Sequence, residues 1–226
     1  MLAHTTNPAA PASRNARMVP PVPSQALDDA LAMMGAVMSY PRNAEIYGEN
    51  EPAEYIYRLV SGSVRTSKIL DDGRRQIGEF YMPGDIFGLE AGREHAFSAE
   101  AITDVKVIVV KRSAIEALAA RDNEVARQLW AVTRRELQRV QDHILLLIKT
   151  AQERVAGFLL EMAERVKASN EIELPMSRQD IADYLGLTIE TVSRTLTSLE
   201  SSAAIALPSS RRVVLRNRAA LRRLNA

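Results

Sequence analysis

Short apolar runs separated by turn residues dominate the first half of the chain. Across residues 43–112, hydrophobic residues alternate with polar ones or form brief β-branched runs, interrupted by pairs such as Asp72-Gly73 and Pro83-Gly84. Glycine accepts a positive φ angle and proline fixes its own, so these pairs favour tight turns between strands. The run Val105 to Val110 is too apolar for an edge strand. The pattern predicts an antiparallel β domain, which we place at residues 25–120.

The pattern becomes helical after this domain, and neither glycine nor proline occurs between Ser113 and Ala156. Ser113 and Glu116 have the spacing of a capping box, which predicts a short helix ending near Ala120. A longer helix follows, because apolar residues recur at alternating intervals of three and four positions, as they do along the seam of a coiled coil. The seam residues are Trp130, Thr133, Leu137, Val140, Ile144 and Leu147.

The seam predicts a homodimer in which this helix, at residues 121–150, pairs with its copy. A second apolar stripe on the same helix would then pack on the β domain. Its members are Val125, Leu129, Val132, Leu145 and Ile148. The alternative is that one monomeric core buries both stripes. The regularity of the heptads favours the dimer.

The segment from Met176 to Ser202 has the pattern of a helix-turn-helix. Ser177, with Asp180 three positions later, is typical of the cap of a first helix. Gly186 ends that helix, because glycine permits the left-handed backbone of a tight turn. Thr188 then caps a second helix with an apolar face. This face contains Ile189, Val192, Leu196 and Leu199.

The opposite face of the second helix is polar. A guanidinium matches the O6 and N7 acceptors of guanine, and a carboxylate accepts from the N4 amino group of cytosine. We therefore expect Glu190, Ser193 and Arg194 to read base edges in the major groove. The alternative is that Glu190 and Arg194 form a surface ion pair worth a few tenths of a kcal/mol. The capping box, the small Ala182 that lets the second helix cross closely, Gly186 and the basic flanks together favour the interaction with DNA.

A winged hairpin is predicted after the second helix. Apolar stretches at 204–207 and 213–216 flank a Pro-Ser-Ser-Arg-Arg segment, so we expect Arg211 and Arg212 at the hairpin tip. Phosphate contacts fix register without reading sequence. The residues expected in this supporting role are Ser177, Arg178, Thr188, Thr191, Thr197, Arg211 and Arg212. With an amphipathic helix before it and a short terminal helix after it, this region forms a predicted DNA-binding domain at 151–226.

Charge distribution agrees with this interpretation. The whole chain has a net charge of +1, but residues 176–226 contain eight arginines and four carboxylates. Basic domain ends often meet polyanions, although a solvated basic tail is the alternative.

Several classes of chemistry are not expected. The chain contains no cysteine, which excludes a disulfide framework, a thiolate zinc site and an iron–sulfur cluster. Its three histidines, His4, His95 and His143, lack metal-ligand spacing. No Ser/His/Asp arrangement points to an enzyme.

The chain shows no sign of export or of a membrane span. Its longest aliphatic run, Ile144 to Ile148, is far shorter than the ~20 apolar residues that cross a bilayer. Residues 1–24 are rich in proline and alanine and lack an apolar h-region, so they predict a flexible tail and not a signal peptide. We expect a cytoplasmic protein with no membrane partner.

The order of β domain, long helix and winged helix-turn-helix resembles the CRP/FNR superfamily of bacterial transcription regulators over roughly residues 44–215. Two segments are similar to its FixK branch. They are Gln141 to Leu147 and Gly186 to Arg194, and the second contains the pattern Glu-x-x-Ser-Arg. The resemblance implies an α+β fold: an N-terminal antiparallel β-roll like that of cyclic-nucleotide-binding domains, a long dimerisation helix and a C-terminal winged helix-turn-helix. It also implies a transcription activator that binds palindromic TTGAT-type promoter sites as a homodimer.

The cofactors of this superfamily are not expected. Its cyclic-AMP receptors have an Arg-Ser pair that clamps the phosphate, whereas Gly88-Leu89-Glu90 is followed here by His95 to Ala99 without arginine. Arg93 is the alternative clamp. The iron–sulfur cluster of FNR requires cysteines that this chain lacks. The second functional hypothesis is a sensor regulator that binds a small effector in the β-roll.

RNA polymerase is a further partner that the resemblance implies. The hairpin of Asp71, Asp72, Gly73 and Arg74 is similar in position to the polymerase-contacting surface of the FNR group.

Overall fold

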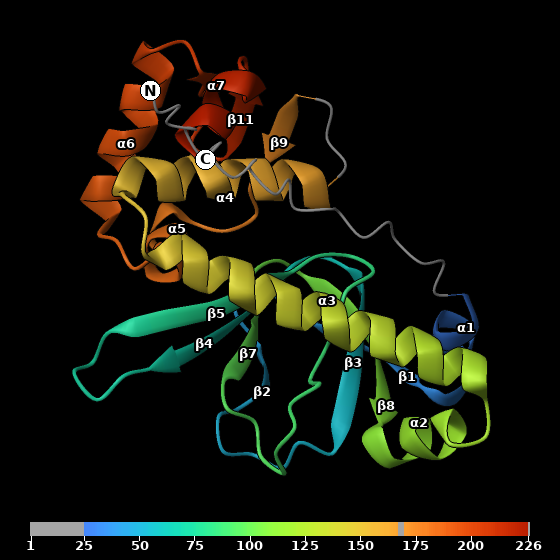
Figure 1. Cartoon of the computed structure of the whole chain (residues 1–226). Coiled ribbons are helices and arrows are strands. Elements are labelled where there is room, and N and C mark those ends of the chain that lie inside the picture. Colours follow the sequence, from blue (N-terminus) through green and yellow to red (C-terminus); the bar gives the residue numbers. More distant parts are fainter. Residues whose placement is uncertain (1–24, 167–169, 226) are drawn as a thin grey trace, which may run out of the picture.

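The chain folds into a β-roll and a C-terminal helical region, with one long helix running between them (Figure 1). The structure is a computed structural model that describes residues 25–166 and 170–225. The predicted tail at 1–24 lies outside the described residues. Within the described part of the chain, no helix is both long and apolar enough to cross a membrane.

The N-terminal region is built from two four-stranded antiparallel sheets, with strand orders β1-β8-β3-β6 and β2-β7-β4-β5. The strands are β1 (Ala36–Tyr40), β2 (Glu45–Tyr47), β3 (Tyr55–Ser61), β4 (Val64–Ile69), β5 (Arg75–Tyr81), β6 (Ile86–Phe87), β7 (Ser98–Ala101) and β8 (Val105–Lys111). Apolar side chains from both sheets share one core. The apolar run at 105–110 lies in β8, which pairs with β1 and β3 and is therefore an interior strand, as predicted.

Two helices, α1 (Gln25–Met34) and α2 (Arg112–Ala119), flank the roll. Both pack on α3 (Asn123–Leu147), and the backbone N–H of Leu27 donates to Gln128 Oε1 at 2.8 Å. The predicted cap at Ser113 is wrong. The helix begins at Arg112 directly after β8, with Lys111 as a cap that makes no side-chain hydrogen bond, so Ser113 already lies in the first turn.

The apolar packing of α3 on the β-roll lies in the N-terminal part of the helix. Val125 and Val132 are buried there, as predicted. Leu145 and Ile148 are exposed, so the prediction that they pack on the β domain is wrong. Near its end the helix instead inserts Leu146 into the core of the C-terminal region.

The C-terminal region contains four helices and a three-stranded sheet of order β10-β11-β9 among the residues described. The elements are α4 (Ala151–Arg165), β9 (Glu171–Glu173), α5 (Arg178–Leu185), α6 (Ile189–Ser201), β10 (Ile205–Ala206), β11 (Arg212–Leu215) and α7 (Arg218–Leu224). Thr150 and Glu153 form a capping box that starts α4. The α+β fold predicted from the sequence is confirmed.

Two arginines, Arg165 and Arg139, attach α4 and α3 to the β-roll. Arg165 of α4 donates to Glu79 at 2.7 Å and to Asp85 at 2.9 Å, both in the β-roll. Arg139 of α3 donates to the same Asp85 at 2.9 Å and to Glu136 at 2.6 Å. The cluster thus connects α3, α4 and the β-roll through charge-assisted hydrogen bonds.

This cluster predicts pH-dependent stability. Burial raises the pKa of both Glu136 and Glu161 from 4.5 to about 7. The folded state therefore binds more protons than the unfolded state, so the stability from these groups is complete below pH 4.5 and is lost as the pH rises through 7. We expect the melting temperature to fall between about pH 5 and pH 8. The double substitution Glu136→Gln with Glu161→Gln should flatten this dependence, whereas Glu94→Gln, at an exposed position, should not. Thermal melts across this pH range measure the effect. If the melting temperature of the double variant depended on pH as strongly as that of the wild type, these two carboxyl groups would not be its cause.

Candidate nucleic-acid interface

The helices of the predicted helix-turn-helix are α5 and α6. Ser177 Oγ accepts from the backbone N–H of Asp180 at 3.0 Å, and the Asp180 carboxylate accepts from the backbone N–H of Ser177 at 2.9 Å. This is the predicted capping box. Gly186 ends α5 with a φ of 61°, the left-handed conformation expected for the turn. Ala182 is fully buried in the core of the C-terminal region.

Gly186→Ala should cost ~1 kcal/mol of stability because alanine is strained at positive φ. An added Cβ would lie 3.5 Å from Arg154 Nη1, which is ordinary contact, so crowding contributes little. Asparagine tolerates this conformation better, and Gly186→Asn is therefore the matched control with a smaller expected loss. Urea unfolding of both variants measures the difference. Equal losses would show that the backbone conformation is not the cause.

Helix α6 has one buried face and one polar face. Val192, Leu196 and Leu199 are buried as predicted, but Ile189 is 37% exposed because it opens the helix at the margin of the core. Thr188 caps α6 by accepting from the backbone N–H of Thr191 at 3.2 Å. On the polar face, Glu190, Arg194 and Thr197 are exposed and Ser193 is half-buried.

Glu190 and Arg194 do not form the surface ion pair that was the alternative. Such helical pairs do form elsewhere in the described residues, for example between Arg139 and Glu136 at 2.6 Å, but these two side chains make none. Hydrogen bonds with its own backbone N–H and the Thr188 hydroxyl, and the positive charge of Arg194, lower the pKa of Glu190. The carboxylate is therefore ionised at neutral pH and able to accept hydrogen bonds from a ligand.

Ser193 is held by the first helix. Arg178 Nη1 donates to Ser193 Oγ at 3.3 Å, which leaves the hydroxyl hydrogen of Ser193 free to donate. The hydroxyl of Thr197 donates to the carbonyl of Ser193 at 3.1 Å. The polar face is therefore partly pre-organised by contacts within the helix-turn-helix.

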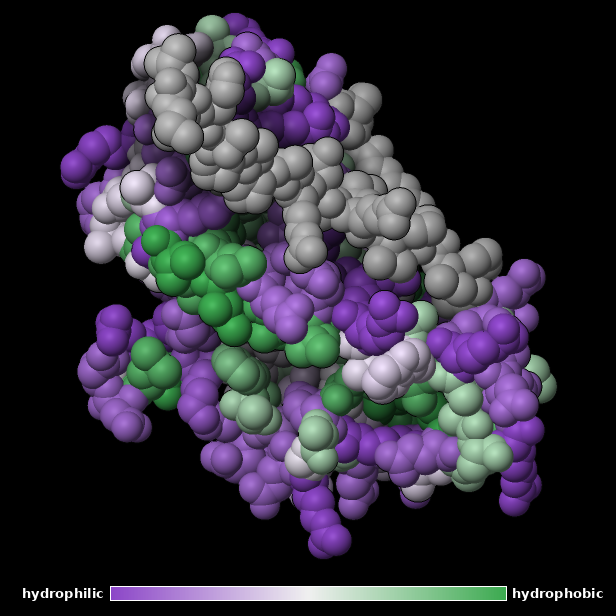
Figure 2. Space-filling model, viewed as in Figure 1, coloured by the Kyte–Doolittle hydropathy of each residue, from purple (hydrophilic) through white to green (hydrophobic). Residues whose placement is uncertain are grey.

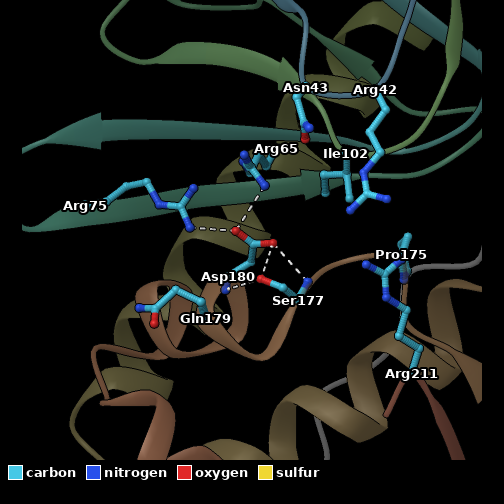
Figure 3. Close-up of a pocket in the computed structure, with 10 residues that line it drawn as sticks. All are labelled: Arg42, Asn43, Arg65, Arg75, Ile102, Pro175, Ser177, Gln179, Asp180 and Arg211. Atoms are coloured by element: carbon cyan, nitrogen blue, oxygen red, sulfur yellow. Dashed lines mark hydrogen bonds and ion pairs between the residues drawn. The ribbon is translucent and has the colours of Figure 1, made fainter. Parts of the chain in front are cut away.

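The wing is the hairpin of β10 and β11. Pro208, Ser209 and Ser210 form the exposed tip, whereas Arg212 begins β11 and forms an ion pair with Glu171 of β9. Arg211 points toward the β-roll (Figure 3). Both arginines lie at the loop end of the hairpin, close to their predicted position, because Arg211 is in the connection between β10 and β11 and Arg212 is the first residue of β11. Their side chains are directed away from the tip, since Arg212 starts the ladder with β9 and Arg211 lines a pocket against the β-roll.

The predicted dimer seam is uncovered in the single chain. Trp130, Leu137, Val140 and Ile144 are 55–65% exposed. Figure 2 shows apolar surface over the C-terminal half of α3, where Leu137, Val140 and Ile144 lie. Thr133 is also exposed, whereas Leu147 is half-buried.

The 71–74 hairpin is exposed between β4 and β5. Asp72 accepts from the Arg74 backbone N–H at 3.0 Å and from Arg74 Nε at 2.7 Å, and Gly73 has a φ of 83°. The conformation leaves the hairpin accessible to a partner.

One feature of α5 was not predicted. Asp180, besides capping the helix, accepts from Arg65 at 3.0 Å and from Arg75 at 2.6 Å, both in the β-roll (Figure 3). Arg75 also donates to Asp183 at 2.7 Å. The helix-turn-helix is thereby attached to the β-roll. The only local signal was the capping spacing of Asp180, since its arginine partners lie 115 and 105 positions away.

Comparisons with known proteins agree with this architecture. Residues 37–122 match the cyclic nucleotide-binding domain family, and residues 153–224 match the Crp-like helix-turn-helix domain family. The nitrogen fixation regulation protein FixK of Azorhizobium caulinodans is 54% identical over 202 residues, covering 87% of this chain and 82% of that protein. FixK of Rhizobium meliloti is 41% identical over 189 residues, covering 83% and 86%.

A solved structure is similar over the same extent. FixK2 from Bradyrhizobium japonicum superposes with a TM-score of 0.82 and 54% identity, covering 85% of this chain and 98% of that one. The helix-turn-helix geometry and these relatives together show that the chain belongs to the CRP/FNR family, as a DNA-binding transcription regulator of the FixK type.

Proposed function

We propose that the protein is a transcription activator that binds a palindromic TTGAT-type promoter site as a homodimer, with Glu190, Ser193 and Arg194 reading the bases. The observation that carries this proposal is the polar face of α6. It presents an ionised carboxylate beside an arginine without an intrahelical ion pair, both on the side opposite the buried residues. Names such as transcriptional activator protein Anr, from a relative in Pseudomonas protegens that is 34% identical, support the activator role.

The α3 seam supports the homodimer. Large apolar side chains at heptad spacing stay exposed along one stripe, and a second copy of the same stripe would cover them in an isologous contact. The two-fold axis of such a dimer would relate its two α6 helices, which would enter major grooves about 34 Å apart, one turn of duplex. Palindromic sites follow from that symmetry.

Backbone contacts would supply the sequence-independent part of the affinity. Ser177, Arg178, Thr188, Thr191 and Thr197 lie on the two helices of the motif. Arg212 can reach phosphate only if its ion pair with Glu171 opens, whereas the guanidinium of Arg211 has no acceptor among the described residues. We further propose that the exposed hairpin at residues 71–74 contacts RNA polymerase.

We also propose that DNA binding needs no cyclic nucleotide. The interior of the β-roll is filled by aromatic side chains: His95 stacks on Tyr47 at 3.6 Å between ring centroids, and Phe87 packs against Tyr57 at 5.1 Å. His95 is 2% exposed and hydrogen bonds to Glu90. Arg93, the alternative clamp, is exposed.

Selection of bound sequences from random duplex DNA by the ligand-free protein tests the function. We expect enrichment of inverted TTGAT elements with a fixed spacing. Enrichment of single, unpaired elements would contradict the homodimer, and no enrichment without an added effector would favour the sensor hypothesis. In that case, calorimetry with cyclic nucleotides would distinguish a sensor that binds such an effector from a protein preparation that is simply inactive.

A further inference from the structure

A cavity of about 320 Å³ lies between the β-roll and the helix-turn-helix (Figure 3). Its wall contains four arginines and one carboxylate. The polar residues that matter here are Arg42, Asn43, Arg65, Arg75, Asp180 and Arg211. They come from both regions of the chain, so an occupant of the cavity would contact both regions at once.

Two of these arginines already have carboxylate partners. Arg65 donates to Asp180 at 3.0 Å and to Glu100 at 2.8 Å. Arg75 donates to Asp180 at 2.6 Å and to Asp183 at 2.7 Å. Three carboxylates thus face two guanidinium groups on this side of the cavity. An anion would be repelled there by Asp180 and would have to lie elsewhere.

The other two arginines have no such partners. Arg42, in the loop between β1 and β2, uses its backbone N–H to donate to Asp104 at 2.9 Å, but its guanidinium forms no hydrogen bond or ion pair among the described residues. The guanidinium of Arg211 likewise has no acceptor there. Figure 3 shows the two side chains extending toward each other from opposite walls, with Asn43 beside Arg42. Two like charges that share one space favour a counter-ion between them.

We propose that this cavity binds a small phosphate-bearing anion between Arg42 and Arg211. Guanidinium groups bind phosphate oxygens through paired, charge-assisted hydrogen bonds, and the Asn43 amide can add a further donor. The volume admits phosphate together with a small organic group. The bound anion would hold the wing against the β-roll. Under the proposed function, it would also compete with DNA phosphates for Arg211.

Titration of the DNA-free protein with inorganic phosphate, and separately with glycerol phosphate, tests this inference. Calorimetry should show saturable binding of these compounds, and the melting temperature should rise to a plateau relative to chloride at equal ionic strength. Tighter binding of glycerol phosphate identifies a phosphate monoester as the favoured ligand, and tighter binding of phosphate identifies the free ion. Arg42→Gln should weaken the affinity at least tenfold, since it removes one of the two facing charges. Arg42→Lys should weaken it less.

The matched control is Arg121→Gln, which removes an exposed arginine after α2 and should leave the affinity unchanged. Melts in chloride alone establish that each variant folds. The inference is overturned if the wild-type protein shows no saturable binding of either compound, or if Arg42→Gln binds as tightly as wild type. Because no DNA is present, these results would leave the proposed base recognition untouched.

Discussion

Arg194→Ala should weaken binding to the cognate half-site by ~1–3 kcal/mol and relax selectivity at a single base pair. Arg194 is exposed on the polar face of α6 and forms no ion pair with Glu190, so the substitution neither opens a cavity nor leaves a paired carboxylate behind. The loss should therefore appear in DNA binding and not in stability. Gel shifts with half-sites varied one base pair at a time, at fixed salt, measure it.

Arg212→Ala is the contrasting variant. Arg212 is the first residue of β11, at the loop end of the wing, where it pairs with Glu171, and we expect it to contact the DNA backbone. Its loss should weaken binding to all DNA sequences alike and reduce the slope of log affinity against log salt concentration by about one. If Arg194→Ala also weakened every sequence equally, its assignment as a base-reading residue would be wrong.

Leu137→Glu should convert the proposed dimer into monomers and reduce affinity for a palindromic site by at least ~100-fold, because the second half-site no longer binds as part of one complex. Leu137 is 57% exposed in the single chain, so a carboxylate there costs little within one protomer. In the dimer interface the carboxylate would be buried opposite the same carboxylate of the second copy, with no cation to pair with. Light scattering and gel shifts on one-site and two-site duplexes separate the two effects.

Arg135→Glu is the matched control. It introduces the same side chain two positions away on α3, at an exposed position outside the apolar stripe. We expect it to remain dimeric and to bind the palindrome nearly as wild type does. A monomeric wild-type protein, or a Leu137→Glu variant that stays dimeric, would disprove the seam as the interface. Circular dichroism verifies that both variants fold.

Asp180 links the helix-turn-helix to the β-roll. The same carboxylate caps α5 and accepts from Arg65 and Arg75, so the orientation of the helix-turn-helix depends on contacts made by the β4–β5 hairpin. Any change that reorders these ion pairs would act on the position of the helix-turn-helix. The arrangement gives a regulator of this kind a physical route between its two regions.

Local features of the fold were determined by the sequence itself. The capping box of Ser177, the turn at Gly186 and the two faces of α6 depend on residue type and on spacings within a single turn or helix. The interior position of β8 followed from its unbroken apolar run in the same way. Such signals need no knowledge of distant residues, which is why the helix-turn-helix could be located and its polar face assigned.

Tertiary structure alone decided the contacts between distant segments. Which side of α3 is covered changes along its length, so Leu146 enters the core while its neighbour Leu145 is exposed, although the two residues have similar side chains. The side chain of Arg211 lines the cavity against the β-roll, although the residue itself belongs to the loop of the wing. The pairing of Arg65 with Asp180 joins residues 115 positions apart. No periodicity encodes such a distance, since it arises only when two separately folded regions pack together.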